Sequence, residues 1–160
     1  LFDLSDRELL ENVLVTSCSI KAEVVSQDEK ESGLRASLNF GHTVGHAIEA
    51  VTGYEEFLHG EAIVHGMIAA LALSRERGLL DDATVNQTVA VLERFNPPAL
   101  PSHIRYESLS GAMQKDKKRS SAGQLWVLLE EIGSSLLTRQ VEEIQVERAV
   151  EFMLSRGAHS

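Results

Sequence analysis

The chain has 160 residues, of which 43% are hydrophobic and 24% charged, and its formal net charge at pH 7 is −9. This composition is typical of one globular domain with a core of its own, and the negative charge argues against a nucleic-acid surface or a polybasic membrane patch. We expect neither a signal peptide nor a membrane span, because no apolar run approaches the ~20 residues that cross a bilayer. The single cysteine, Cys18, excludes an internal disulfide, and the sequence predicts a cytoplasmic protein.

Apolar residues recur at helical spacing along most of the chain, and Gly, Pro and polar residues separate the runs. The predicted helices begin near residues 5, 34, 59, 81 and 106, and a final amphipathic helix carries Val146, Val150 and Leu154. Ser5 is the expected N-cap of the first helix, since Ser5-Asp-Arg-Glu8 has the spacing of a capping box. The second helix is expected to cover residues 34–52 without interruption and to end at Gly53.

Three segments of the second half are not expected to be helical. Residues 96–101 contain three prolines and form a rigid connector, and the basic run 115–119 is expected in an exposed loop. Residues 124–129 and 135–138 flank a turn at Gly133 and predict a two-stranded hairpin. The sequence therefore predicts a mainly α, multi-helix domain with one small β-hairpin near residues 124–140.

The predicted helix over residues 34–52 carries polar side chains on one side of an otherwise apolar surface. At roughly 100° per residue, five of them fall within about 80° of one another. They are Arg35, Asn39, His42, His46 and Glu49. The apolar side would face a core, whereas a guanidinium, an amide and two imidazoles on the other side indicate contact with a polar ligand or a metal ion.

Two histidines of this helix have a spacing that suits a metal. His42 and His46 are four residues apart, which can place two imidazoles on one ion, and His59 is a third candidate at the start of the next predicted helix. Thr43 follows His42 where a zinc protease of the zincin type would carry its glutamate, so a protease is not expected. Each histidine alone is also compatible with a hydrogen-bonded, half-buried structural role.

Other residues near this helix have structural interpretations. His65 follows His59 by six residues, so it points away from that side chain, and we expect it to be structural. Gly41 and Gly45 are costly inside a helix, which indicates close approach either of a ligand or of a second helix backbone.

Several blocks of the sequence together resemble 3-dehydroquinate synthase. The blocks are Lys21–Glu29, Gly33–Arg35, Leu38–Glu49, His59–Met67 and Asp116–Lys118, and residues 127–133 also fit. Five separated blocks in the right order are very unlikely to arise by chance. The resemblance covers nearly the whole chain, but only the C-terminal, helical half of that enzyme.

The resemblance implies a lyase that makes 3-dehydroquinate and phosphate from 3-deoxy-D-arabino-heptulosonate 7-phosphate, in the shikimate pathway. Such enzymes bind NAD and a divalent metal, Zn²⁺ or Co²⁺, between two domains, and usually form homodimers. The N-terminal half, with the NAD site and the glutamate that completes the metal site, has no counterpart here. We therefore expect residues 1–160 to form one helical metal- and substrate-binding domain, inactive alone, whose partner is an N-terminal NAD-binding domain.

The same resemblance implies a role for each matched histidine. His42 and His59 resemble the two histidine ligands of the metal. His46 resembles the histidine that transfers protons near the oxidisable hydroxyl and the phosphate of the substrate.

Matched cations and an amide are implied to bind the substrate. Lys21 and Arg35 match the basic pair that holds the carboxylate, and Asn39 matches a phosphate contact. Either Lys117 or Lys118 matches a further lysine on the phosphate side. With His46, the residues Lys21, Arg35 and Asn39 make up the implied catalytic set.

Three alternatives remain open at this stage. A sister sugar-phosphate cyclase of the inosose or valiolone type would share the metal histidines, although Arg35, Asn39 and His46 together favour dehydroquinate synthase. A metal-dependent glycerol or alcohol dehydrogenase would leave the basic residues without a purpose. A non-catalytic helical interaction domain would bind no metal at His42 and His59.

Overall fold

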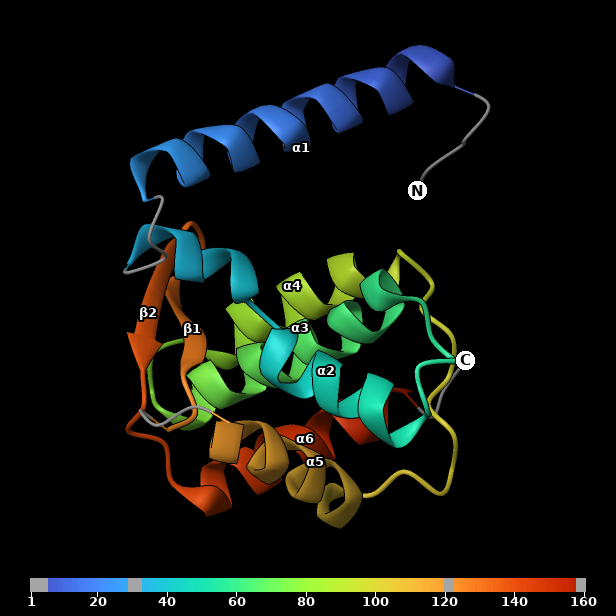
Figure 1. The fold of residues 1–160 in the computed structure, drawn as a ribbon, viewed down its shortest axis with the longest axis vertical. Coiled ribbons are helices and arrows are strands. Elements are labelled where there is room, and N and C mark those ends of the chain that lie inside the picture. Colours follow the sequence, from blue (N-terminus) through green and yellow to red (C-terminus); the bar gives the residue numbers. More distant parts are fainter. Residues whose placement is uncertain (1–5, 29–32, 120–122, 158–160) are drawn as a thin grey trace. The chain divides into compact units, whose positions relative to one another are not determined.

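The structure is a computed structural model that describes residues 6–28, 33–119 and 123–157. In chain order its elements are α1 (Arg7–Gln27), the 3₁₀ helix η1 (Leu34–Asn39), α2 (His42–Val51), α3 (His59–Glu76), α4 (Asp82–Glu93), α5 (Tyr106–Arg119), β1 (Trp126–Glu131), β2 (Ser134–Thr138) and α6 (Glu143–Gly157) (Figure 1). These residues are mostly helical and include a two-stranded hairpin, which confirms the predicted fold class. Within the described ranges, no helix has both the length and the apolar character to cross a membrane.

The chain divides into two compact units, Leu1–Leu38 and Asn39–Ser160. In the first unit, α1 is capped by Asp6, whose Oδ1 accepts a hydrogen bond from the backbone N–H of Leu9 at 3.0 Å. The predicted N-cap, Ser5, is therefore wrong, and Ser5 itself lies outside the described residues. Both residue types can accept this bond from the first turn, and an aspartate also interacts favourably with the helix dipole.

The prediction of one uninterrupted helix over residues 34–52 is also wrong. The chain forms η1, breaks, and starts α2 after Gly41, whose backbone is left-handed with φ +82° and ψ −13°. Glycine adopts this conformation without a steric penalty, so it serves here as the N-cap of a new helix. Arg35 and Asn39 consequently belong to η1, and α2 keeps three of the five polar residues: His42, His46 and Glu49.

The close approach of α2 and α3 explains why glycine occurs in this part of the sequence. A Cβ at Gly66 of α3 would lie 2.0 Å from the carbonyl oxygen of Gly41 and 2.8 Å from the backbone nitrogen of Gly45. A Cβ at Gly45 would in turn lie 2.7 Å from Cδ1 of Ile63. The sequence left two explanations for Gly41 and Gly45, close approach of a ligand or close approach of another helix. The structure shows the close approach of another helix, α3.

Most of α3 is buried, because α2, α4, α6 and β1 all pack against it. The β1–β2 hairpin is antiparallel, pairs Trp126 with Thr138, and lies where the sequence predicted it. It is joined to α3 through Ser74, a completely buried residue whose Oγ accepts from the Leu129 N–H at 3.0 Å and donates to the Ala70 carbonyl at 2.9 Å. The buried hydroxyl is thus satisfied on both sides.

Two further segments follow α3. Asp81 caps α4 by accepting from the Thr84 N–H at 2.7 Å, and residues 96–101 are non-helical, as predicted. The basic run 115–119 was predicted to form an exposed loop after a helix that begins near residue 106. This prediction is wrong, because α5 continues to Arg119. The side chains of residues 116–119 lie outside the described residues.

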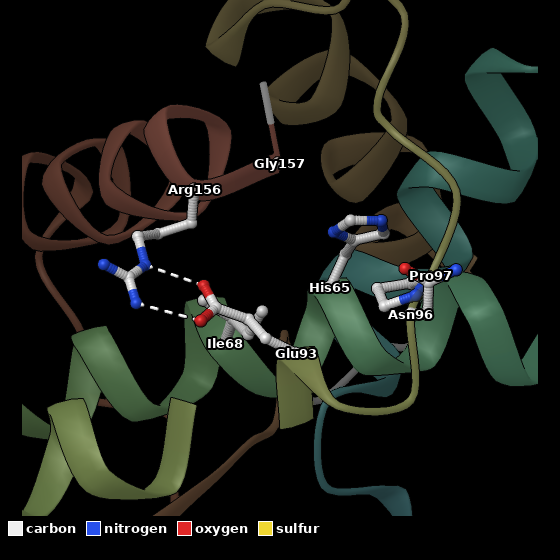
Figure 2. Close-up of a pocket in the computed structure, with 7 residues that line it drawn as sticks. All are labelled: His65, Ile68, Glu93, Asn96, Pro97, Arg156 and Gly157. Carbon is white, nitrogen blue, oxygen red and sulfur yellow. Dashed lines mark hydrogen bonds and ion pairs between the residues drawn. The ribbon is translucent and has the colours of Figure 1, made fainter. Parts of the chain in front are cut away.

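His65 is part of the core of α3, as predicted. It is 2% exposed, and its Nε2 donates to the carbonyl of Pro98 at 2.9 Å, which fastens the proline-rich connector to α3. Figure 2 shows His65 beside a pocket that also contains the ion pair between Glu93 and Arg156, with 2.9 Å from Nε to Oε1. Burial holds the pKa of His65 below its ordinary value, although the bond to Pro98 opposes this shift.

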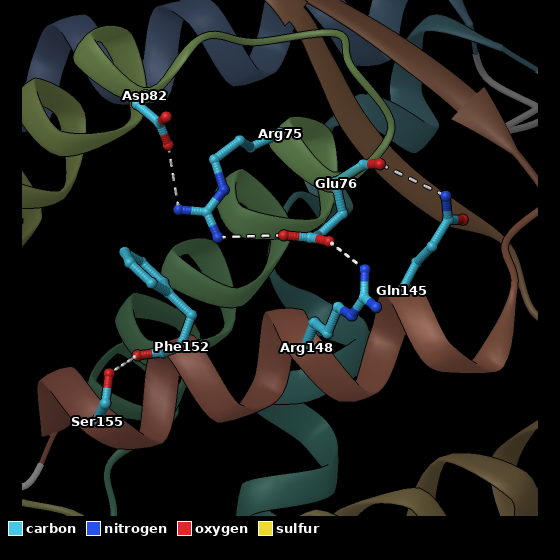
Figure 3. Close-up of polar contacts among 7 residues, drawn as sticks. All are labelled: Arg75, Glu76, Asp82, Gln145, Arg148, Phe152 and Ser155. Atoms are coloured by element: carbon cyan, nitrogen blue, oxygen red, sulfur yellow. Dashed lines mark hydrogen bonds and ion pairs between the residues drawn. The ribbon is translucent and has the colours of Figure 1, made fainter.

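Polar contacts fasten the C-terminal end of α3 to α4 and α6 (Figure 3). Arg75 pairs with Glu76 at 3.2 Å and with Asp82 at 3.4 Å, and its Cζ lies 4.8 Å from the ring centre of Phe152. Glu76 also pairs with Arg148 at 3.6 Å. Each of these partly solvent-accessible pairs stabilises little by itself, but together they hold the C-terminal end of α3 in place.

Replacing Gly66 with alanine tests the close packing of α2 on α3. We expect Gly66→Ala to lower the free energy of unfolding by about 3 kcal/mol or more, because its Cβ meets backbone atoms that cannot move aside alone. Gly111→Ala in α5 is the matched control, since a Cβ there meets nothing within 4 Å, and it should stabilise by about 0.5–1 kcal/mol. Urea unfolding measures both, and a Gly66→Ala protein as stable as the parent would contradict the packing.

The buried His65 predicts a loss of stability in acid. The unfolded chain takes up a proton at His65 near pH ~6.5, whereas the folded chain takes it up only at lower pH. This contribution is therefore complete above pH ~6.5 and decreases below it, by at most about 1.4 kcal/mol per pH unit. His65→Gln keeps a donor for Pro98 and removes the titration, so its unfolding free energy should depend less on pH between about 5 and 7. If the unfolding free energies of the parent and of His65→Gln depended on pH in the same way, His65 would not be a buried neutral imidazole. His42 is present in both proteins and therefore does not affect this comparison.

Candidate metal centre

Three histidine rings from two helices face one another at the start of α2 and α3. His42 and His46 lie one turn apart on α2, and His59 is the first residue of α3. The ring centroid of His42 is 5.3 Å from that of His46 and 5.3 Å from that of His59. The centroids of His46 and His59 are 5.8 Å apart. One ring nitrogen from each lies within 4.8 Å of the others. The geometry therefore brings together all three histidines that the sequence singled out.

Two of these rings are oriented by oxygen atoms behind them. Nδ1 of His42 is 3.3 Å from the carbonyl oxygen of Phe40, and Nδ1 of His59 is 3.1 Å from Oε1 of Glu49. Each oxygen accepts a hydrogen bond, so the proton of the neutral ring is assigned to Nδ1 and the lone pair to Nε2. Metal-binding histidines commonly have this arrangement, in which a carbonyl or carboxylate fixes the ring from its other side. The residues present thus fit a divalent metal ion.

The contact of Glu49 with His59 is the feature that sequence reasoning missed. The sequence predicted Glu49 on the same side of the helix as His42 and His46, but gave no partner for its carboxylate. In the structure its largely buried carboxylate instead holds a candidate ligand in place. Among the described residues, the group able to share one ion consists of histidines alone.

The protonation of His42 suits metal binding. Burial lowers its pKa most, and the nearby rings of His46 and His59 lower it further, while the bond to Phe40 opposes the shift. His42 is therefore neutral at pH 7. A metal ion requires this form, because a protonated imidazole has no lone pair to offer.

A groove between α2 and α5 reaches His46, one of these three histidines. It has a volume of about 930 Å³, and His46 and Glu49 line it together with Lys115 of α5. The groove thus places a cation, an imidazole and two carboxylates, those of Glu49 and Glu107, along one surface.

The predicted substrate-binding residues are distributed over both units. Lys21 lies on α1 and Arg35 on η1, in the first unit, and the backbone N–H of Arg35 donates to Oδ2 of Asp28 at 3.1 Å. Asn39 begins the second unit and lines a small cavity with Trp126. The side chains of Lys117 and Lys118 lie outside the described residues, and the roles of this whole set stay predictions.

A family model described as 3-dehydroquinate synthase C-terminal matches residues 1–119. The chain belongs to this family. A 3-dehydroquinate synthase of Picosynechococcus sp. is 44% identical over 137 residues, which are 85% of this chain and 38% of that protein. One of Nostoc punctiforme is 40% identical over 147 residues, or 91% of this chain and 40% of that protein. The chain thus spans about two fifths of the length of these relatives.

Two solved structures have the same fold. A 2-epi-5-epi-valiolone synthase of Streptomyces hygroscopicus with NAD⁺ and Zn²⁺ bound matches 94% of this chain and 42% of its own, with a TM-score of 0.80 and 24% identity. A 2-deoxy-scyllo-inosose synthase complexed with carbaglucose-6-phosphate, NAD⁺ and Co²⁺ matches 89% of this chain and 42% of its own, with a TM-score of 0.75 and 25% identity.

Removing the carboxylate of Glu49 tests its function behind His59. We expect Glu49→Ala to weaken Zn²⁺ binding by about 10–100-fold, because the ring of His59 loses the partner that fixes its orientation and proton. Glu107→Ala removes another carboxylate from the same groove and should leave the affinity within about twofold. Competition with a chromophoric chelator measures both affinities. Equal affinities of the two variants would show that Glu49 does not position the ring.

Proposed function

We propose that this chain is the metal- and substrate-binding part of a 3-dehydroquinate synthase. The reaction converts 3-deoxy-D-arabino-heptulosonate 7-phosphate to 3-dehydroquinate and phosphate, the second step of the shikimate pathway. The observation that carries the proposal is the pairing of His42 with His59, each turned so that Nε2 is available to one ion, in a member of this family. Relatives named 3-dehydroquinate synthase support the choice of reaction.

In this proposal His42 and His59 hold the metal through Nε2, and Glu49 keeps His59 oriented. When bound, the divalent ion supplies a Lewis acid for a substrate hydroxyl, and NAD supplies the hydride acceptor. His46 lies beside His42 at the edge of the groove, where its imidazole can accept a proton from a hydroxyl and return it later. The same ring nitrogen of His46 accepts the proton and later returns it, so the side chain keeps its position between the two steps.

The basic residues account for the two anionic ends of the substrate. Arg35 has a planar fork that matches a carboxylate, and Lys21 offers a point charge for the same group. Asn39 and either Lys117 or Lys118 bind the phosphate in the proposal. Such cations are needed in a chain of net charge −9, which by itself would repel a dianionic phosphate.

The remaining requirements belong to the part of the relatives that this chain does not span. We propose that an N-terminal domain supplies the NAD site and a further metal ligand, that the complete protein is a cytoplasmic homodimer, and that this chain alone has no synthase activity. The valiolone synthase structure, with NAD⁺ and Zn²⁺ bound in a chain more than twice as long as the matched part, is compatible with this division of labour.

A second candidate is a sister sugar-phosphate cyclase. The solved structures with this fold are named valiolone and inosose synthases, and the histidine pair suits all of these reactions. The curated relatives favour the synthase of dehydroquinate, because they match at higher identity. The two candidates differ in the substrate that they accept.

Joining this chain to the N-terminal part of the Picosynechococcus relative tests the proposal. We expect phosphate release from the heptulosonate phosphate, little from glucose 6-phosphate or sedoheptulose 7-phosphate, and a loss of at least ~100-fold in kcat/KM for His42→Ala. His103→Ala, in the exposed turn before α5, is the control and should keep full activity. Preference for one of the other sugar phosphates would favour the sister cyclases, and release by the unjoined chain would contradict the proposed division.

A further inference from the structure

We propose that the cavity beside His65 binds a small, neutral molecule rich in hydroxyl groups, such as a sugar or a cyclic polyol. The cavity has a volume of about 590 Å³, a size typical of small-molecule sites. Its lining comes from α3, from the connector after α4, and from the last residues of α4 and α6 (Figure 2). None of the described residues that line it also lines the groove beside His46. The site is therefore separate from the candidate metal centre and does not depend on the proposed function.

His65 offers this cavity a hydrogen-bond acceptor that has no donor. The residue is 2% exposed, and its Nε2 donates to the carbonyl of Pro98, so the lone pair of the neutral ring lies on Nδ1. Within the described part of the chain, no group donates to Nδ1. In Figure 2 this nitrogen lies on the side of Glu93 and Arg156, which line the same cavity. A buried acceptor without a partner costs free energy, and a hydroxyl group placed against it would remove that cost.

The charged wall of the cavity can both accept and donate hydrogen bonds. Glu93 and Arg156 form an ion pair through two hydrogen bonds, 2.9 Å from Nε to Oε1 and 3.1 Å from Nη2 to Oε2. The side chains of Glu93 and Arg156 are 40% and 36% exposed, so a ligand can reach both. Each carboxylate oxygen can accept a further hydrogen bond, and the pair uses two of the five N–H donors of the guanidinium. Hydroxyl groups, which donate and accept, suit this wall.

The surroundings favour a ligand without net charge. Glu93 and Gly157 are the last residues of α4 and α6, and the carbonyl end of a helix carries a partial negative charge that repels an anion. The guanidinium of Arg156 already supplies the cation that such helix ends attract. Ile68 and Pro97 add an apolar surface, against which the C–H face of a sugar or polyol ring can pack.

The walls of the cavity are fastened to one another before any ligand binds. The backbone N–H of Leu100 donates to the carbonyl of Gly157 at 3.3 Å, which joins the connector to the end of α6. A Cβ at Gly157 would lie 3.0 Å from Cδ1 of Leu100 and 3.5 Å from Cε1 of His65, so the end of α6 packs closely on both side chains. A ligand bound here would therefore order few protein groups that are not already ordered.

NMR of the 160-residue chain with ¹⁵N-labelled histidine tests the site, because the shift of an imidazole nitrogen reports its proton and its hydrogen bonds. At neutral pH we expect His65 to carry its proton on Nε2. The probe D-glucose should shift the Nδ1 resonance of His65 in a saturable way, with a Kd of about 1–10 mM, and should leave the exposed His103 unchanged. Glucuronate and glucosamine, which add a negative or a positive charge to the same ring, should bind at least ~3-fold more weakly.

Two variants locate the binding. His65→Phe removes the acceptor and keeps a ring, whereas Glu93→Gln removes a carboxylate charge and leaves His65 in place. We expect each to weaken glucose binding by about tenfold, measured from the backbone amide shifts of the lining residues. Asp82→Asn removes a carboxylate from another ion pair, outside the cavity, and is the matched control that should bind glucose like the parent. Circular dichroism shows whether each variant is folded, and Glu93→Gln remains decisive if His65→Phe does not fold.

Several results would overturn the inference. Glucose that leaves Nδ1 of His65 unshifted at about 100 mM would mean that no such ligand reaches it, as would a proton on Nδ1 in the free chain. A folded Glu93→Gln chain that binds glucose like the parent would place the binding elsewhere. Tighter binding of either charged sugar than of glucose would contradict the neutral ligand class. The synthase activity of the joined protein is measured separately and has no bearing on these results.

Discussion

The contact between the backbones of α2 and α3 is the constraint on which the candidate site depends. Glycine at positions 41, 45 and 66 removes the side chains that would separate the helices, and a single Cβ at Gly66 would overlap the carbonyl oxygen of Gly41. Helices packed through ordinary side chains keep their axes about 8–10 Å apart. The closer contact here sets His59, the first residue of α3, against the ring of His42 at the first residue of α2.

The same contact decides which polar residues act together. Once His59 lies over α2, its Nδ1 reaches the carboxylate of Glu49, and the ring turns its other nitrogen toward His42. Ser74 and the polar cluster around Arg75 hold the other half of α3 against β1, α4 and α6. The core thus fixes the direction of α3, and its exposed first turn carries the candidate metal ligand His59.

Periodicity and turn residues predicted the helices and the hairpin, because those signals are local. The break at Gly41 was not predictable in this way, since apolar spacing continues through η1 and the left-handed backbone of Gly41 occurs where α2 meets α3, a tertiary contact. Local composition also misassigned the basic run, although Lys, Arg and Gln are good helix formers and allow α5 to continue. The histidines were identifiable from their spacing and the family resemblance. The pairing of Glu49 with His59 depends on a tertiary contact that no sequence spacing encodes.

Two helix N-termini meet at the candidate site, because His42 begins α2 and His59 begins α3. Each N-terminus carries a partial positive charge of about half a unit, which opposes a cation and favours an anion. Imidazoles are neutral ligands, so they do not offset this charge, and the carboxylate of Glu49 lies behind His59, where it offsets the charge only in part. An ion held here would therefore gain more from a negatively charged further ligand than from another neutral one.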